Sequence, residues 1–245
     1  MVTFTDFQFQ LLKKYYQVDT TISPESYRLS LNAIFKPTFS NSIKDKFVID
    51  FGCGHGLDTE ELAQLGARLA YGIDIREDLI NTNSKRNLPN NCKFGTRLPD
   101  ELKNTADVIV SVDAFEHFDD PRFILGLMYE NLHPGGEAYI SFGPTWFHPR
   151  GGHTFSVFPW SHLILSEDAL MKWRNQYYQD GATKMHEVAG GLNKFSINKF
   201  QNIFKESEFE VLEFNCKPIR NQKWLQKILG REFATSMVSV HLRKP

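Results

Sequence analysis

The chain has 245 residues, of which 41% are hydrophobic and 23% are charged, and its formal net charge is -1. This composition is typical of a globular protein with room for one large α/β domain. The charge shows no sign of the basic excess that a nucleic-acid-binding domain usually carries.

The first 45 residues are predicted to form an N-terminal helical cap. The dipeptide Ser23-Pro24 should break it into separate helices, because serine suits a helix cap and proline suits the first helical position. From residue 46 the pattern alternates between apolar strands and amphipathic helices. The predicted strands are 46–51, 69–75, 92–96, 107–113 and 137–143, and the predicted helices are 58–66, 77–87 and 121–132. Such alternation, with short connections, predicts a mostly parallel sheet with helices on both faces.

The alternation stops at Pro144. Residues 144–195 are too long for a simple connector, so we expect a functional insertion. The pattern then resumes with a helix over 196–207, strands over 209–216 and 234–243, and a short basic helix around 221–229 between them. The two late strands predict an antiparallel hairpin at the sheet edge. The predicted organisation is therefore a cap over 1–45 and one α/β domain over 46–245 that carries an insertion at about 144–195.

The stretch VIDFGCGHGLDTEEL, residues 48–62, carries the strongest motif. Gly52, Gly54 and Gly56 follow the first strand, where they permit a tight turn and a close approach of the backbone to a ligand. Asp74 stands at the end of the second strand, the position from which an acidic side chain accepts hydrogen bonds from ribose hydroxyls. A nucleoside-bearing ligand is the functional interpretation. A tight strand-to-helix turn without any ligand is the plainer alternative.

The spacing of the glycines restricts the class of ligand that the loop could bind. The chain has GxGxG where dinucleotide-binding proteins have GxGxxG, and no GK[ST] of a P-loop follows. Asp50 comes directly before the glycines. A carboxylate there is unfavourable beside a pyrophosphate but favourable beside an ammonium or sulfonium group, because opposite charges attract.

These residues resemble the motif region of class I S-adenosylmethionine-dependent methyltransferases. DVIVSVDAFEHFDDP (107–121) and LHPGGEAYISF (132–142) are similar to the ubiquinone-biosynthesis-like branch, methyltransferase type 11. The resemblance covers about residues 46–143. It implies a Rossmann-like, seven-stranded, mostly parallel sheet with an antiparallel last strand, and S-adenosyl-L-methionine as the cofactor.

The resemblance also implies roles for single residues. The Gly52–Gly56 loop, which includes Cys53, would pack against the methionine part of the cofactor, and Asp50 would orient its ammonium group. Asp74 would bind the ribose hydroxyls and Ile75 would flank the adenine. The family often has an acidic residue after the third strand, whereas this chain has Thr96 and Arg97 there. The adenine contacts at this place would then come from the backbone or from Thr96.

Candidates for a catalytic base stand after the fourth strand and in the insertion. A hydroxyl acceptor needs a group that removes its proton, and histidine suits this role near neutral pH. The candidates are His153, His148 and His117, with Asp113 as a base, an orienting partner or a cofactor contact. Glu116 is interpreted as a helix cap or a hydrogen-bond partner of its own loop.

The insertion is also rich in aromatic residues. We expect them to form a substrate pocket or lid over the methyl donor, although they could simply pack the insertion onto the sheet. They are Trp146, Phe147, Phe155, Phe158 and Trp160. The spacing of the insertion's histidines matches no zinc pattern, so no metal is expected.

The expected protein is a methyltransferase that acts on a small molecule, by O-methylation of a sugar, a phenolic compound or a secondary metabolite. The [DNS]PP[YFW] signature of nucleic-acid amino-methyltransferases is replaced by VDAFEH. A non-catalytic S-adenosylmethionine-binding protein and a nicotinamide-dependent oxidoreductase remain as alternatives.

The sequence also bears on the compartment. The three cysteines contain no CxxC pair, the first residues lack a secretory signal, and no run approaches the ~18 apolar residues of a membrane span. We therefore expect a cytoplasmic protein with neither a membrane nor a nucleic-acid partner. The sequence does not indicate its oligomeric state.

Overall fold

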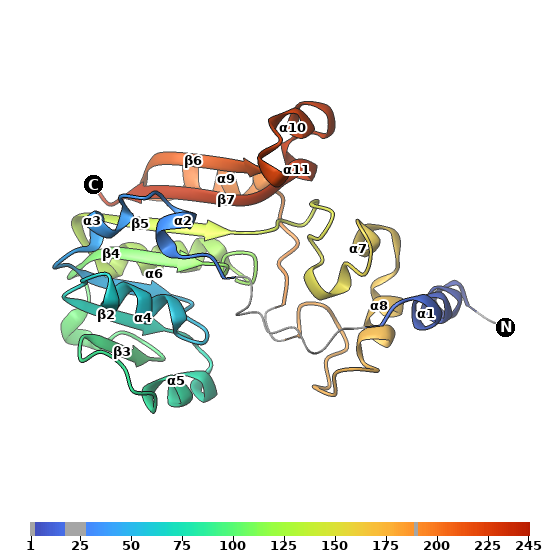
Figure 1. Ribbon diagram of the computed structural model, residues 1–245, viewed down its shortest axis with the longest axis horizontal. Helices are drawn as coiled ribbons and strands as arrows, with labels where there is room; N and C mark the ends of the chain where they lie inside the picture. The colour runs from blue at the N-terminus through green and yellow to red at the C-terminus, as the bar shows by residue number, and fades with distance from the viewer. Residues whose placement is uncertain (1–2, 18–27, 189–190) are drawn as a thin grey trace.

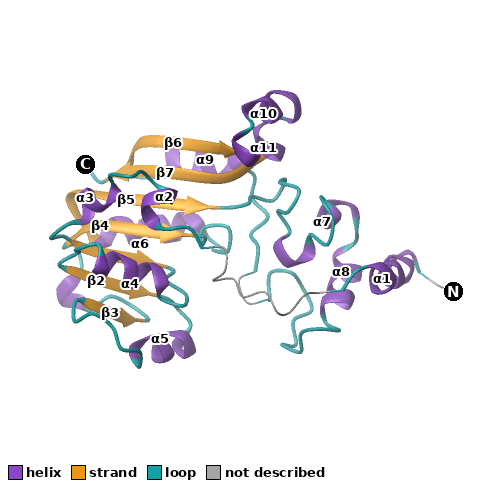
Figure 2. Ribbon diagram, viewed as in Figure 1, coloured by secondary structure: helices purple, strands orange, loops and turns teal. Residues whose placement is uncertain are grey.

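The computed structural model describes residues 3–17, 28–188 and 191–245, so the predicted break at Ser23-Pro24 lies outside the described residues. Its centre is a seven-stranded sheet in the order β3-β2-β1-β4-β5-β7-β6 (Figures 1 and 2). The strands are β1 (Phe47–Phe51), β2 (Leu69–Ile73), β3 (Cys92–Gly95), β4 (Ala106–Val112), β5 (Leu132–Phe142), β6 (Glu210–Pro218) and β7 (Thr235–Arg243).

The directions of the strands confirm the predicted fold class. The pairings β1–β2, β1–β4, β2–β3 and β4–β5 are parallel, whereas β7 is antiparallel to both β5 and β6. The strand order reverses between β1 and β4, which are direct neighbours. Because ligands of such sheets bind beyond the carboxyl ends of the strands at this reversal, the loops after β1 and β4 are placed to form a site.

Helices cover both faces of the sheet (Figure 1). One face packs on α6 and α9, and the other on α2, α3 and α4. The α-helices are α1 (Phe4–Tyr15), α2 (Leu31–Ile34), α3 (Phe39–Ile43), α4 (Leu57–Gln64), α5 (Glu77–Ser84), α6 (Pro121–Asn131), α7 (Ser161–Ile164), α8 (Glu167–Arg174), α9 (Ile197–Lys205), α10 (Lys223–Leu229) and α11 (Arg231–Ala234). Short 3-10 helices are η2 (Asp100–Leu102), η3 (His153–Phe155) and η4 (Ile219–Asn221).

Strand β5 starts earlier than its sequence predicts. The pattern places a turn at HPGG and a strand from 137, whereas β5 runs from Leu132. Its register against β4 shifts, with Ala106 opposite Leu132 but Val108 opposite Glu137. Gly135 takes a φ of 82° and donates its N–H to the Lys244 carbonyl. Gly135 and Gly136 therefore form an irregularity within the strand. Because the sequence HPGG is also typical of a turn, the sequence alone does not distinguish this irregularity from a loop.

Helix α1 packs on the insertion and not on the sheet. Leu12 lies in a small hydrophobic core with Phe155, Trp173 and other residues of the insertion. Gln8 Oε1 accepts hydrogen bonds from the backbone N–H and the hydroxyl of Ser166, just before α8. We call α1 together with residues 144–195 the insertion lobe. Helices α2 and α3 contact the sheet, and the division of the chain at residue 45 stays a prediction.

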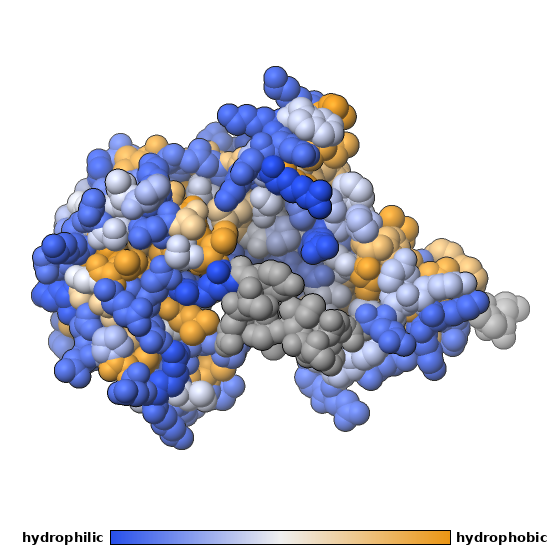
Figure 3. Space-filling model, in the orientation of Figure 1, coloured by the Kyte–Doolittle hydropathy of each residue, from blue (hydrophilic) through white to orange (hydrophobic). Residues whose placement is uncertain are grey.

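Hydrophobic side chains remain exposed on α1 and α10 (Figure 3). On α1 these include Phe4 and Tyr15, and on α10 they include Trp224 and Ile228, the last of which is 71% exposed. In the residues that the structure describes, no helix is long and apolar enough to cross a membrane.

The core of the insertion lobe gives a first prediction. Trp173 is 2% exposed, and its indole N–H donates to the Tyr16 carbonyl at 3.1 Å. Trp173→Ala should therefore lower the free energy of unfolding by about 3–5 kcal/mol, the usual cost of emptying a core of an aromatic side chain. Trp224→Ala, at a half-exposed position, is the matched control. Equal losses for the two variants in urea denaturation would contradict the description of this core.

Candidate functional site

The glycine loop after β1 fits its surroundings only because it lacks side chains. Gly52 and Gly56 take φ values of 80° and 73°, which favour glycine. A Cβ atom on Gly52 would lie 2.9 Å from Cβ of Ala114, in the loop after β4. A Cβ atom on Gly56 would lie 2.6 Å from the ring of Phe94. The loop thus packs tightly against its neighbours. Because the glycines have no side chains, they do not cover the backbone of the loop.

Asp74 reaches this loop from the end of β2. Its Oδ2 accepts the N–H of Gly54 at 2.9 Å, and its Oδ1 accepts the backbone N–H and Nε of Arg76 at 3.0 and 3.1 Å. Burial opposes ionisation of this carboxyl, but the hydrogen bonds from Arg76 and Gly54 outweigh it and lower the pKa of Asp74. A charged acceptor therefore stands beside the glycine loop, as the motif predicts.

Asp50 lies beneath the loop and is 2% exposed. Its Oδ2 accepts the hydroxyl proton of Thr59 at 2.6 Å. Burial raises the pKa of Asp50 to about 8, and the carboxylate of Asp58 adds to this shift. Burial therefore favours the protonated form of Asp50, whereas a nearby cation would favour its ionised form.

Arg28 lies beside the candidate site, and the sequence reasoning did not single it out. Its Nη2 lies 2.6 Å from Oδ1 of Asp58 and also contacts Glu61, so it sits at the start of α4 beside the glycine loop. Burial disfavours its charge, but Asp58 and Glu61 outweigh this and raise the pKa of Arg28. Its separation of 30 residues from Asp58 leaves no local signal in the sequence.

The remaining predicted cofactor residues surround the loop. Cys53 is buried, and burial raises the pKa of its thiol well above the usual range, so it is a poor nucleophile. Ile75 is 90% exposed, and Thr96 is exposed after β3. An exposed isoleucine next to Asp74 offers a flat apolar contact at the rim of the site.

The loop after β4 brings two acidic side chains to the site. Asp113 takes a φ of 49°, and its N–H donates to the Ser141 carbonyl at 2.8 Å. Although part of the Asp113 side chain is accessible, desolvation by the surrounding protein and the charge of Glu116 raise its pKa to about 7. Glu116 is 3% exposed, and burial raises its pKa to about 7 as well.

The structure brings two of the predicted histidines together. The ring centroids of His117 and His153 are 5.2 Å apart, although the residues come from different segments. Burial lowers the pKa of His153 to about 4, and the proximity of His117 adds to this, so the imidazole of His153 is neutral near pH 7. His148 accepts the N–H of Arg150 with Nδ1, and burial lowers its pKa to about 4.

The insertion's aromatic residues make packing contacts. Trp146 and Phe155 belong to the core of the insertion lobe or its border. The ring of Phe158 lies 5.5 Å from that of Tyr16, and the ring of Phe147 lies 5.6 Å from that of Phe233 in α11. The indole N–H of Trp160 donates to the Phe147 carbonyl. The aromatics therefore hold the insertion together, and whether some also contact a substrate stays a prediction.

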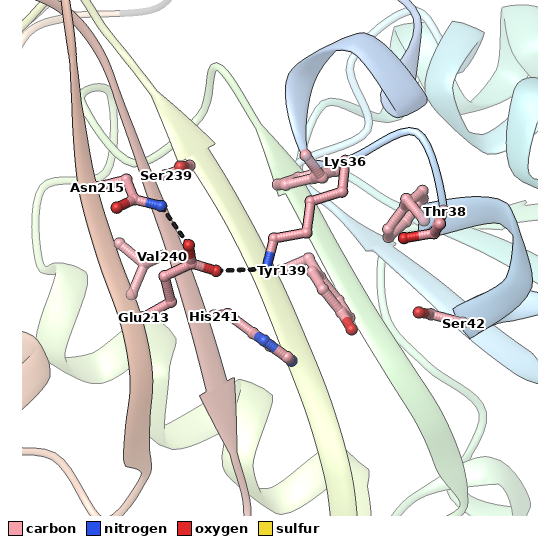
Figure 4. Close-up of a pocket in the computed structure, with 11 residues that line it drawn as sticks. Lys36, Thr38, Ser42, Tyr139, Glu213, Asn215, Ser239, Val240 and His241 are labelled. Atoms are coloured by element: carbon pink, nitrogen blue, oxygen red, sulfur yellow. Dashed lines mark hydrogen bonds and ion pairs between the residues drawn. The ribbon is translucent and has the colours of Figure 1, made fainter.

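One cavity lies away from the glycine loop. It has a volume of about 210 Å³ and lies between the α2–α3 segment and strands β5, β7 and β6 (Figure 4). Lys36 Nζ crosses it to Glu213 Oε2 at 2.7 Å, and Tyr139 and His241 stack with centroids 4.2 Å apart. None of its lining residues belongs to the site just described, so it marks a gap beneath α2 and α3 that this ion pair bridges.

No metal centre is seen in the part of the chain that the structure describes: no group of three or more His, Cys, Asp or Glu side chains there could hold an ion.

Known proteins resemble this chain in sequence. The family model described as "Methyltransferase domain" matches residues 25–213, more than half of the chain. The chain is 29% identical over 113 residues to a ubiquinone biosynthesis O-methyltransferase of Idiomarina loihiensis, covering 44% of this chain and 46% of that protein. A protein of the same name from Methylococcus capsulatus is 31% identical over 106 residues, 41% of this chain and 44% of the relative. The chain thus spans less than half the length of these curated relatives.

Solved structures share the fold. An S-adenosylmethionine-dependent methyltransferase of Methanosarcina mazei has a TM-score of 0.55 at 18% identity, covering 88% of this chain and 99% of that one. One from Mesorhizobium loti has a TM-score of 0.52 at 18% identity, covering 85% and 96%. At this identity the likeness shows the fold alone.

The raised pKa of Asp50 gives a prediction for stability. The folded state holds this proton up to about pH 8, whereas the unfolded chain releases it near 3.8, so raising the pH between these values favours unfolding. The wild type should therefore lose stability relative to Asp50→Asn as the pH rises from about 4 to about 8. Urea denaturation of both proteins at several pH values measures this difference.

The lowered pKa values of His148 and His153 make stability rise with pH, which opposes the effect of Asp50. Because both proteins share this contribution, it cancels in the difference between their free energies of unfolding. Asp119→Asn, at an exposed position, controls for the loss of a surface charge. A difference between wild type and Asp50→Asn that stays constant with pH would show that Asp50 is ionised in the folded protein.

Proposed function

We propose a function from the premise that the chain belongs to the methyltransferase domain family: it transfers a methyl group from S-adenosyl-L-methionine to an oxygen of a small molecule. The observation that carries this proposal is the meeting of Asp74 with the Gly52–Gly56 loop. Oδ2 of Asp74 accepts a hydrogen bond from the N–H of Gly54 at 2.9 Å. A charged acceptor for ribose hydroxyls therefore lies directly beside a loop whose glycines leave the backbone open to a ligand.

The residues fit this cofactor at its nucleoside end. Asp74 would accept the two ribose hydroxyls in place of the Arg76 side chain, whose guanidinium is 44% exposed and free to withdraw into solvent. The exposed side chain of Ile75 would lie along one face of the adenine. The N–H of Gly54, which already donates to Asp74, would keep the carboxylate oriented.

The residues also fit the amino-acid end. Asp50, Asp58 and Asp113 surround the loop, and their mutual repulsion contributes to the raised pKa values of Asp50 and Asp113. A cationic ligand relieves this repulsion, whereas an anionic pyrophosphate would increase it. Arg28, held by Asp58, would pair with the carboxylate of the methionine part.

The cofactor supplies an activated methyl group on its sulfonium. The protein must place the acceptor oxygen in line with that methyl group, and positioning of this kind lowers the barrier most. As the new oxygen–carbon bond forms, the bond from that carbon to the sulfonium sulfur would break and leave a thioether, and the acceptor hydroxyl must lose its proton. Asp113 and the neutral His153 are the proposed acceptors of that proton, with His117 next to His153 and His148 as the further candidate.

The proposed acceptor class rests on weaker support. The curated relatives are named O-methyltransferases, which favours oxygen as the acceptor atom. A sugar, a phenolic compound or a secondary metabolite with a free hydroxyl is the proposed substrate, in a cytoplasmic protein.

Cofactor binding gives the first test. Asp74→Ala should weaken binding of S-adenosylmethionine and S-adenosylhomocysteine by about 1.5–3 kcal/mol, because it removes charge-assisted hydrogen bonds. Calorimetry measures this, with Asp78→Asn in the first turn of α5 as a control for loss of negative charge nearby. No heat and no thermal shift with either compound in the wild type would end the proposal, and binding of NADH instead would favour an oxidoreductase.

Transfer of a labelled methyl group to a panel of sugars and phenols gives the second test. His153→Ala or Asp113→Asn should slow the transfer by roughly 10²–10⁴-fold, the usual contribution of a general base, while cofactor binding persists. His186→Ala, at an exposed position, is the control. Unchanged turnover in variants of Asp113, His117, His148 and His153 would remove the base role, and cofactor binding without transfer to any acceptor would favour a binding protein.

A further inference from the structure

The loop after β4, residues 113–118, contacts both ends of the insertion. The insertion leaves β5 at Gly143 and returns to α9 after Phe195, so its two ends are far apart in sequence. Both lie against this one loop. The backbone N–H of Trp146 also reaches the carbonyl of Phe195, at 3.4 Å, which joins the two ends directly.

Glu116 holds the first end. Its Oε1 accepts the N–H of Gly143 at 3.0 Å, and its side chain is buried. Glu116 and Thr145 line one small cavity, and Oε2 of Glu116 and Oγ1 of Thr145 are both buried without a hydrogen-bond partner in the described residues. A buried carboxyl group is costly, so its retention here needs a reason beyond packing.

Asn193 holds the second end. Its Nδ2 donates to the carbonyls of Phe115 and Phe118 at 2.8 and 3.1 Å, and its backbone N–H donates to the carbonyl of Glu116 at 3.0 Å. Its Oδ1 accepts the N–H of Phe195 at 3.1 Å. One amide side chain therefore joins the loop after β4 to the segment that leads into α9.

The same loop touches the glycine loop on its other side. Ala114 lies against Gly52 so closely that no Cβ atom fits between them, and Asp113 is the first residue of the same loop. A displacement of the glycine loop therefore pushes on residues 113–118, and these carry both ends of the insertion.

We propose that Glu116 and Asn193 are positioning residues that join the insertion lobe to the cofactor side of the site, so that binding of the cofactor tightens the lobe over the acceptor. This rests on the proposed function, because it assigns the glycine loop to the cofactor. Neither side chain touches the reacting atoms; each acts through the backbone that it holds.

Hydrogen exchange with and without S-adenosylhomocysteine tests this coupling without a known acceptor. In the wild type, the ligand should protect amides of residues 48–62 and also amides of residues 144–195. Asn193→Asp keeps the acceptor for Phe195 but places a carboxylate oxygen against two carbonyls. Exchange in residues 144–195 should then become about tenfold faster, since buried groups are left unpaired, and their response to the ligand should be lost while that of 48–62 remains.

Asn175→Asp is the matched control, because Asn175 donates to the Ala182 carbonyl within the insertion and does not reach the loop after β4. It should leave the response to the ligand intact. Glu116→Gln should also preserve the response, since an amide oxygen can still accept from Gly143, whereas Glu116→Ala should abolish it. A response that Glu116→Gln keeps and Glu116→Ala loses would show that Glu116 acts through its hydrogen bond to Gly143 and not through its negative charge.

The outcomes are distinct. Protection of 48–62 without protection of 144–195 in the wild type, or an Asn193→Asp protein that responds as the wild type does, overturns the inference. An absence of any protection by the ligand in the wild type contradicts the proposed function itself. In that event, exchange of the ligand-free Asn193→Asp and Asn175→Asp proteins still decides whether Asn193 holds the insertion.

Discussion

Gly52 lies so close to the loop after β4 that a Cβ atom on it would fall 2.9 Å from Cβ of Ala114. This contact forms where the strand order reverses, between the carboxyl ends of β1 and β4. Because the glycine loop touches the loop after β4, the proposed nucleoside-binding loop lies directly beside the acidic residues after β4. The positions of Asp113, Glu116 and the ends of the insertion all follow from this contact.

The site concentrates acidic groups, of which Asp50 and Glu116 are buried and Asp113 is exposed. All three have raised pKa values, chiefly because desolvation by the surrounding protein disfavours their charged forms. Such groups weaken a fold unless their position serves another purpose. Glu116 accepts a backbone N–H. In the proposed methyltransferase, Asp50 would stabilise a bound cation and Asp113 would receive a proton.

The sheet and the meeting of Asp74 with the glycine loop could be predicted from the sequence because their signals are local. Apolar runs alternate with helices over residues 46–143, and the GxGxG spacing with Asp74 needs only the strand ends to become a site. Contacts between distant segments left no such signal. Arg28 reaches Asp58 across 30 residues, and Asn193 reaches Phe115 across 78. The early start of β5 was missed because its glycines are also typical of turns.

The packing of α1 on α8 gives the insertion lobe a hydrophobic core of its own. Leu12, Phe155 and Trp173 form a core that is distinct from the two cores of the sheet. Substitutions within this core can therefore reshape the insertion lobe without repacking β1, β2 and the helices that cover the sheet. Under the proposed function, the surface that would meet the acceptor and the loop that would bind the methyl donor are packed around different hydrophobic cores.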